Sequence, residues 1–294
     1  MNTVRAQTLK RPRLRQRKIV NSFMLGLSGL FTALAVIPLL WILIYVIGKG
    51  APEMTLSFFT HLPTPSGIAG GGLANALVGS LITVGLGALI AAPIGILSAF
   101  YLFYQPNTTL GTALRFATDV ISGVPSIVMG IFAYTLIVIP QRHFSAFSGG
   151  AVLAFIMLPI IIRTTEEMLR LIPQTLREGS LALGATEWRT SLSVLLPAAA
   201  NGVITGLMLA IGRAAGEAAP MLFTAFGNPY LSTSLNQPTA TLPHTIFVYA
   251  ISPYADQQSK AWGAALVLIV LVLALNLGAK AFASWRAKKM GAGA

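Results

Sequence analysis

The sequence predicts an all-α integral membrane protein with six membrane-spanning helices. Only 10% of the 294 residues are Asp, Glu, Lys or Arg, and 55% are hydrophobic; a soluble domain averages roughly 25% charged residues. The mean hydropathy is +0.75. These charges are too few to coat a globule in water, which excludes a cytosolic enzyme, a secreted disulfide scaffold and a disordered chain. The sequence has no cysteine, so the chain supplies no thiolate for a disulfide or a metal.

Six apolar stretches account for the predicted spans. Crossing the hydrocarbon core takes about 20 mostly apolar residues. The fourth stretch is short and contains Pro159, and the first is too long for a cleaved signal peptide. We expect spans at residues 19–47, 73–103, 114–139, 150–162, 192–223 and 261–282.

These spans divide the chain into a tail, a first helix, a core and a second tail. The basic tail covers residues 1–18 and the first helix covers 19–47. The core covers 73–283, with five helices and a polar loop at 164–191. Residues 284–294 form the second tail.

Basic residues are distributed unevenly between the two sides of the predicted membrane. Sixteen lysines and arginines lie in residues 1–18, at Arg115, between 163 and 189, or from 280 onward. The other side has three, namely Lys49, Arg142 and Lys260. Because cytoplasmic loops carry the excess of Lys and Arg, we expect both termini in the cytoplasm. The first tail would also suit an RNA-binding arm, but a topology anchor that meets anionic lipid is favoured.

Two connections on the outer side are long. Residues 48–72 are rich in proline and glycine, and residues 227–260 are rich in small polar residues and proline. Such composition favours irregular surface backbone. Two interpretations stay open: simple linkers, or a docking surface for a partner outside the membrane.

The connection between the fourth and fifth spans contains a short two-faced helix. Pro173 suits the first turn of a helix, and Gly184 permits a sharp turn where that helix ends. Between them lies Glu178, with Leu176 and Leu181 nearby. Such a helix either packs into a groove of another protein or lies on the lipid surface.

This segment resembles the EAA loop of ABC importer permeases. The family consensus is E-A-A, three residues, G, nine residues, then I-x-L-P. Here Glu178-Gly179-Ser180 is followed at the same spacing by Gly184 and by Val194-Leu195-Leu196-Pro197. The departures are small or isosteric. The resemblance implies that an ATPase subunit contacts Glu178, Gly179, Ser180, Gly184, Ala185, Thr186, Leu196 and Pro197.

Other segments are similar to the A-type permease subunits of phosphate-specific importers, within the binding-protein-dependent transport permease family. The run GRAAGEAAP at residues 212–220 is the most specific, and the segments 56–60, 70–80, 122–126 and 261–266 also match. The resemblance implies a type I ABC importer permease (MetI-like) fold in a bacterial inner membrane. It also implies a heterodimer with a C-type permease, two cytoplasmic ATPase subunits and an extracytoplasmic phosphate-binding protein. Each permease would form half of the phosphate path.

No lysine lies in a G-x-x-x-x-G-K-[ST] context, the motif that cradles the phosphates of ATP. We therefore expect ATP and Mg on the partner ATPase and no cofactor on this chain, which is interpreted as a transport subunit and not an enzyme. A G-x-S-x-G elbow is also absent, which argues against an intramembrane enzyme. His61, His143 and His244 lie in separate outer connections, so no metal site is expected.

Arg213 and Glu217 are the candidate substrate-path residues. They stand four residues apart in the predicted fifth span and so share a helix face. Charges there cost roughly 2.5 kcal/mol or more near the membrane centre, so they face protein or water. One interpretation is an intrahelical salt bridge. The other is a water-filled path, in which the planar fork of Arg213 contacts phosphate and Glu217 holds or releases the guanidinium.

Glycine spacing predicts how the fifth span packs. Gly202/Gly206 and Gly212/Gly216 both have the G-x-x-x-G spacing that allows close helix contact. At roughly 100° per residue the two pairs face different directions. We therefore expect this span to pack on more than one side.

Two alternative functions remain open. An ion-driven secondary transporter would need coupling carboxylates in its spans, and only Glu217 and Asp119 are available. We expect Asp119 near the start of the third helix, where an acid suits the helix dipole. A permease for another oxyanion, sulfate or molybdate, is the closer alternative, because the binding protein sets most of the selectivity.

Overall fold

The structure is a computed structural model that describes residues 12–291. It is helical, and its described part contains isolated β-bridges but no strand. The chain divides into two units, Met1–Gly48 and Lys49–Ala294. The first unit holds most of helix α1 (Pro12–Gly50), which continues through Pro38. Residues 1–11 of the predicted basic tail, and 292–294 of the second tail, lie outside the described residues.

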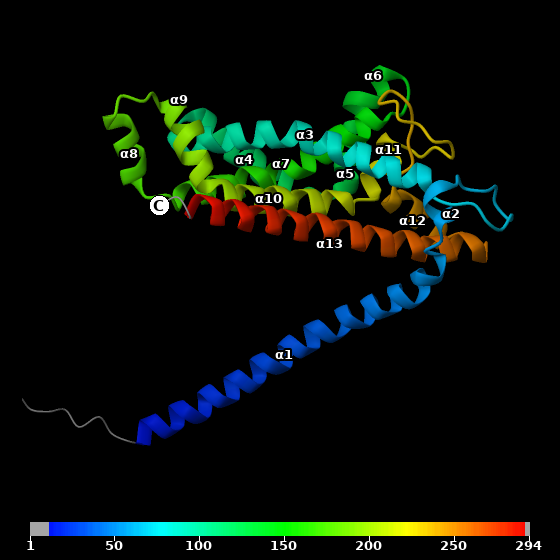
Figure 1. Cartoon of the computed structure of the whole chain (residues 1–294), viewed down its shortest axis with the longest axis horizontal. Coiled ribbons are helices and arrows are strands. Elements are labelled where there is room, and N and C mark those ends of the chain that lie inside the picture. The colour runs from blue at the N-terminus through cyan, green and yellow to red at the C-terminus, as the bar shows by residue number, and fades with distance from the viewer. Residues whose placement is uncertain (1–11, 292–294) are drawn as a thin grey trace, which may run out of the picture. The chain divides into compact units, whose positions relative to one another are not determined.

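Four long helices run side by side in the second unit (Figure 1): α3 (Ala74–Tyr104), α7 (Ala146–Arg170), α10 (Leu196–Ala215) and α13 (Ala255–Gly291). Helix α7 is the most buried of these candidate spans. The core around it mixes large and small side chains, including Met157, Ile161, Ala91, Ala210 and Ala214. Small residues let the helix backbones approach closely.

Helix α10 packs on two sides, as its glycine spacing predicts. A Cβ at Gly202 or Gly206 would overlap Met168 or Thr164 of α7. Gly212 instead faces α13, where Val272 lies 3.4 Å from the position of its would-be Cβ. The close approach predicted for the first glycine pair is therefore confirmed.

The third predicted span is not one helix. The chain forms α4 (Thr109–Gly123), then α5 (Ser126–Ala133), the π-helical segment η2 (Tyr134–Val138) and α6 (Ile139–Gln141). The helix axis bends by 111° between Thr109–Gly123 and Ser126–Gln141. Pro125 lacks the N–H that would continue α4, and it keeps the preceding Val124 extended at φ −75° and ψ 130°. Five described helices are long and apolar enough to span a membrane, and there are six if the bent pair counts as one span.

The ends of the fourth and fifth spans also differ from the prediction. Helix α7 is longer than residues 150–162, because its polar last turns remain helical. The fifth begins at α9 (Glu187–Thr190), passes through the π-helical segment η3 (Ser191–Leu195) and continues as α10. It ends at Ala215 and not at residue 223, where a separate helix, α11 (Ala219–Thr224), intervenes. Pro197 accounts for η3, because it cannot donate to the carbonyl four residues earlier.

The second unit has two distinct ends (Figure 1). One carries α8 (Gln174–Ala182) and α9, and the other carries α2 (Leu56–Thr60), α6, α11 and α12 (Leu242–Ala250). At the latter end the buried Lys260 donates to Asp256 (2.8 Å) and to the Gly70 carbonyl, which holds the glycine-rich loop against α13. Lys260 thus lies inside α13 and not in a connection, because this helix begins six residues earlier than expected, at Ala255.

Candidate functional site

Helix α8 presents apolar side chains to its surroundings instead of to the core. None of its nine residues is buried. Leu183, which follows it, is 91% exposed, and Leu176 and Trp188 are exposed as well. Glu178 and Gly179 lie exposed on the same helix. Clustered exposed apolar side chains mark a contact surface, so α8 has the character of a helix that docks on a partner or on lipid.

Gly184 ends α8 in a turn that requires a left-handed backbone. Its φ is +83°. Its N–H donates to the Leu181 carbonyl (2.9 Å), and the Ala185 N–H donates to the Ser180 carbonyl (3.2 Å). This is the Schellman arrangement, with glycine one residue past the cap. No described atom lies within 4 Å of a would-be Cβ at Gly184, so the backbone conformation, and not crowding, requires glycine here.

Side-chain contacts fasten α8 to α9 and to the end of α3. Arg177 forms an ion pair with Glu187 and lies 4.9 Å over the ring of Tyr104. The hydroxyl oxygens of Ser180 and Thr190 are 2.9 Å apart. The hydrogen bond to Glu187 raises the pKa of Arg177, which favours the charged pair. The α8–α9 segment is therefore a braced unit, connected by side-chain contacts to the end of α3.

The remaining residues of the predicted coupling set have backbone and core roles. Thr186 Oγ1 accepts a hydrogen bond from the Arg189 N–H (3.4 Å) and so begins α9. Leu196 and Pro197 begin α10, where Leu196 packs against a buried core cluster. The structure brings 178–186 together in one unit and leaves these two residues in the adjoining span.

A polar pocket lies among apolar residues of α4, α5, α7 and α10. Its volume is about 30 Å³, room for about one or two water molecules. Arg213 and Glu217 supply charged groups, and Ser122 and Ser126 supply hydroxyl groups. Because Ser126 is the first residue of α5, the break after α4 forms part of the wall. The apolar lining comes from Ile121, Val124, Met129, Ile156, Pro159 and Ile160.

Arg213 and Glu217 line the same pocket but do not share a helix face. Helix α10 ends at Ala215, and the Glu217 N–H bonds to the Ala214 carbonyl (3.1 Å) in the turn that follows. Among residues 12–291 no ion pair joins Arg213 to Glu217, so the structure does not contain the intrahelical salt bridge that was one of the two interpretations. The Arg213 side chain is exposed. Its donors are available to an anion that enters the pocket.

Asp119 does not lie at a helix start. Helix α4 begins at Thr109, ahead of the predicted stretch, because Thr108 Oγ1 accepts a hydrogen bond from the Gly111 N–H (3.1 Å) and caps the helix. Asp119 therefore sits near the other end of α4, where it pairs with Arg163 of α7. An ion pair, and not the helix dipole, compensates its charge.

A line of charged residues along α4 and α7 is absent from the predicted sites. Arg115 of α4 donates to Glu166 of α7 (2.6 Å), which also accepts from Arg170 (2.7 Å). The sequence signal is the three- and four-residue spacing of Arg163, Glu166 and Arg170, which places them on one helix face. The identity of the helix opposite that face is a property of the tertiary fold.

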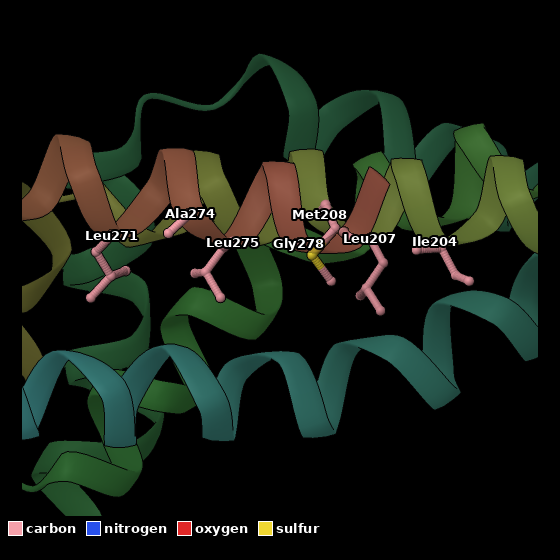
Figure 2. A pocket seen from close by; sticks show the side chains of 8 residues that line it. Ile204, Leu207, Met208, Leu271, Ala274, Leu275 and Gly278 are labelled. Carbon is pink, nitrogen blue, oxygen red and sulfur yellow. The ribbon is translucent and has the colours of Figure 1, made fainter. Parts of the chain in front are cut away.

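Two larger pockets are mostly apolar and have no charged side chain in their lining. The first, of about 630 Å³, lies between α10 and α13 (Figure 2) and is lined by Ile204, Leu207, Met208, Leu271, Ala274, Leu275, Gly278 and Ala279. The second, of about 180 Å³, shares Leu271 and Leu275 and reaches α3. Within residues 12–291 no three His, Asp or Glu side chains are placed to hold a metal ion. Of these three pockets, only the small one is lined by charged side chains.

Comparison with known proteins identifies the family. Residues 91–291 match the family described as "Binding-protein-dependent transport system inner membrane component". The chain is 42% identical over 267 residues to "Phosphate transport system permease protein PstA" of Haemophilus influenzae, covering 90% of this chain and 94% of that protein. A protein of the same name from Xylella fastidiosa is 45% identical over 269 residues, covering 91% and 93%.

A solved structure shares the fold. A chain from "Inward facing conformations of the MetNI methionine ABC transporter" superposes with a TM-score of 0.57 at 18% identity, covering 72% of this chain and 93% of that one. At this identity the likeness shows the fold alone, and it confirms the predicted ABC importer permease fold. The chain therefore belongs to the family of binding-protein-dependent transport system inner membrane components, and within that family to the PstA group of phosphate transport system permeases.

Proposed function

We propose that this chain is the membrane-spanning permease subunit of an ATP-driven phosphate importer in a bacterial inner membrane, with both termini in the cytoplasm. The names of its relatives support the substrate. The excess of Lys and Arg supports the orientation. One observation carries the proposal: Arg213, with no carboxylate partner among the described residues, lines a polar pocket among apolar helices.

Arg213 suits transient contact with phosphate. Its planar guanidinium donates to two phosphate oxygens at once, and the hydroxyls of Ser122 and Ser126 line the same pocket. A single arginine holds the anion weakly, which suits passage better than capture. Glu217 competes for the guanidinium and so favours release. Tight capture belongs to a separate phosphate-binding protein, which docks at the end formed by α2, α6, α11 and α12.

Partner subunits supply what the chain lacks. We assign the other half of the path to a C-type permease in a heterodimer, and ATP and Mg to two ATPase subunits. The exposed face of α8 would seat in a groove of one ATPase, where closure moves α3 and α10 through the braced α8–α9 unit. This chain would bind no cofactor and carry no catalytic residue.

The proposed parts of the chain follow from these roles. Residues 1–18 anchor the topology, and residues 19–47 form the first span. The permease core covers 73–283 and includes the coupling loop at 164–191. Residues 284–294 form a cytoplasmic tail.

Reconstitution of the complete complex tests the proposal. Liposomes containing both permeases and the ATPase, supplied with the binding protein, are expected to show phosphate-stimulated ATP hydrolysis and phosphate uptake. Sulfate and molybdate are assayed in parallel, and stimulation by either one in place of phosphate would change the assigned substrate. Uphill uptake by this chain without the ATPase would identify a secondary transporter instead.

Arg213→Lys tests the role of the guanidinium. The variant keeps the charge and removes the fork, so we expect phosphate uptake to fall about tenfold or more, the worth of one hydrogen bond to a charged group. Assembly with the partner subunits is expected to stay normal, as measured by co-purification. Full uptake by the lysine variant would contradict a bidentate contact.

A further inference from the structure

Charged side chains continue from the Arg213 pocket along the facing sides of α4 and α7. Asp119 and Arg163 form the first ion pair outside the pocket. Each lies one helical turn from a residue that lines the pocket, Ser122 on α4 and Pro159 on α7. The pair is therefore the next set of charged side chains beside the pocket, in the direction of the α8 end.

A second group of charged side chains lies one turn further along α4 and α7. Arg115 and Arg170 both donate to the carboxylate of Glu166, at 2.6 and 2.7 Å. We call these five residues (Arg115, Asp119, Arg163, Glu166 and Arg170) the charged stripe. At about 1.5 Å per residue, the stripe extends roughly 10 Å along α7 from Arg163 to Arg170, which is the last residue of that helix.

The charges of the stripe argue against a surface that faces lipid. The side chains of Arg163 and Asp119 are 51% and 64% exposed. Both lie on helices that form candidate membrane spans. Charged groups in that position almost always face protein or water, because lipid solvates them poorly. The predicted topology places the stripe at the cytoplasmic end of these helices, so it borders the cytoplasm, an aqueous passage that opens into the cytoplasm, or a polar partner surface.

The charges of the stripe are nearly balanced. Three arginines share two carboxylates, which leaves one net positive charge in the stripe. The Nε of Arg115 is buried and has no hydrogen-bond partner among the described residues. Each guanidinium thus has a carboxylate that an anion must displace, and none is an isolated positive charge that would retain one.

We propose that the charged stripe is the inner half of the phosphate passage, so that phosphate moves from Arg213 to Arg163 and then to Arg115 and Arg170. The inference rests on the proposed function and adds the exit route to it. At each step phosphate takes over the hydrogen bonds that a guanidinium gives to Asp119 or Glu166. The carboxylate recovers those bonds when the anion leaves, which favours release toward the α8 end.

Three variants of the Asp119–Arg163 pair, in the reconstituted complex, test this inference. Arg163→Gln is expected to lower the maximal rate of phosphate uptake about 10- to 100-fold, the worth of one hydrogen bond to a charged group. The external phosphate concentration for half-maximal uptake is expected to stay unchanged, because the binding protein sets it. Asp119→Asn leaves Arg163 unopposed, so phosphate added inside the liposomes is expected to inhibit uptake at lower concentration than in the wild type.

The double variant Arg163→Gln/Asp119→Asn separates passage from helix pairing. It removes both charges and leaves none unpaired. If the pair only holds α4 against α7, the double variant recovers uptake relative to the single variants, and this would overturn the inference. If Arg163 contacts phosphate, the double variant stays as slow as Arg163→Gln. Lys280→Gln, an exposed change on α13, is the control and is expected to match the wild type.

The wild type and Arg213→Lys are measured alongside these variants. A wild-type complex that does not import phosphate would overturn the proposed function. Phosphate import by the wild type, impaired by Arg213→Lys and unaffected by Arg163→Gln, would overturn the charged stripe alone. Unchanged inhibition by internal phosphate in Asp119→Asn would likewise contradict it.

Discussion

Gly184 holds a backbone conformation that costs other residues about 1–2 kcal/mol. Two hydrogen bonds of the α8 terminus depend on it. The surrounding space is open among the described residues, so a larger side chain meets no atom of this fold. The glycine therefore matters for the angle of the chain after α8, and for whatever molecule approaches α8 from outside.

Two substitutions at Gly184 separate these effects. Gly184→Val is strained at positive φ, so we expect the end of α8 to unwind and co-purification with the ATPase to fall. Gly184→Asn is the matched control, because asparagine tolerates the left-handed region, and it is expected to assemble nearly normally. If both variants fail equally, a clash with the partner and not backbone strain is the cause.

At the scale of whole elements, hydrophobicity alone predicts that the spans exist. It predicts their ends less well. The 111° break after α4 depends on Pro125, and a proline in an apolar stretch either kinks a helix or is absorbed, as Pro159 is in α7. Because α10 ends at Ala215, Glu217 lies outside the helix that carries Arg213, contrary to the prediction. Ion pairs between α4 and α7 require the tertiary fold, so sequence spacing reveals only one side of each pair.

The packing of α10 on α7 gives a prediction at this scale. A Cβ at Gly206 would overlap both Cβ and Oγ1 of Thr164, so rotation of the threonine side chain does not relieve the clash. Gly206→Ala is expected to destabilise the protein by about 1–3 kcal/mol, read as a lower midpoint of thermal unfolding in detergent. Gly212→Ala is the control, since its Cβ would meet Val272 at an ordinary 3.4 Å. Equal losses in the two variants would show that close α7 contact is not the cause.

On the scale of the whole molecule, the two ends of the second unit differ in structure. The α8–α9 end exposes a braced helix with apolar side chains. The opposite end consists of short helices and loops, held by buried polar contacts such as that of Lys260 with Asp256. Placing these ends on opposite sides of the membrane follows from the proposed orientation.

The lack of native cysteine makes that orientation simple to measure. Thr175→Cys on α8 and Thr233→Cys in the loop before α12 both introduce thiols at exposed positions. In intact cells with a permeabilised outer layer, a membrane-impermeant maleimide is expected to label the second variant and not the first. Inverted membrane vesicles are expected to give the reverse pattern. Labelling of Thr175→Cys from outside would reverse the proposed topology.

The small volume of the Arg213 pocket has a consequence for the cell's energy supply. A space of about 30 Å³ admits one or two waters and is too small for a tetrahedral oxyanion. On the path that we propose, the pocket in this conformation is therefore closed to phosphate on this chain's side. A path that stayed open would let small ions cross and dissipate the membrane potential. A path that opens only when the ATPase hydrolyses ATP preserves that potential.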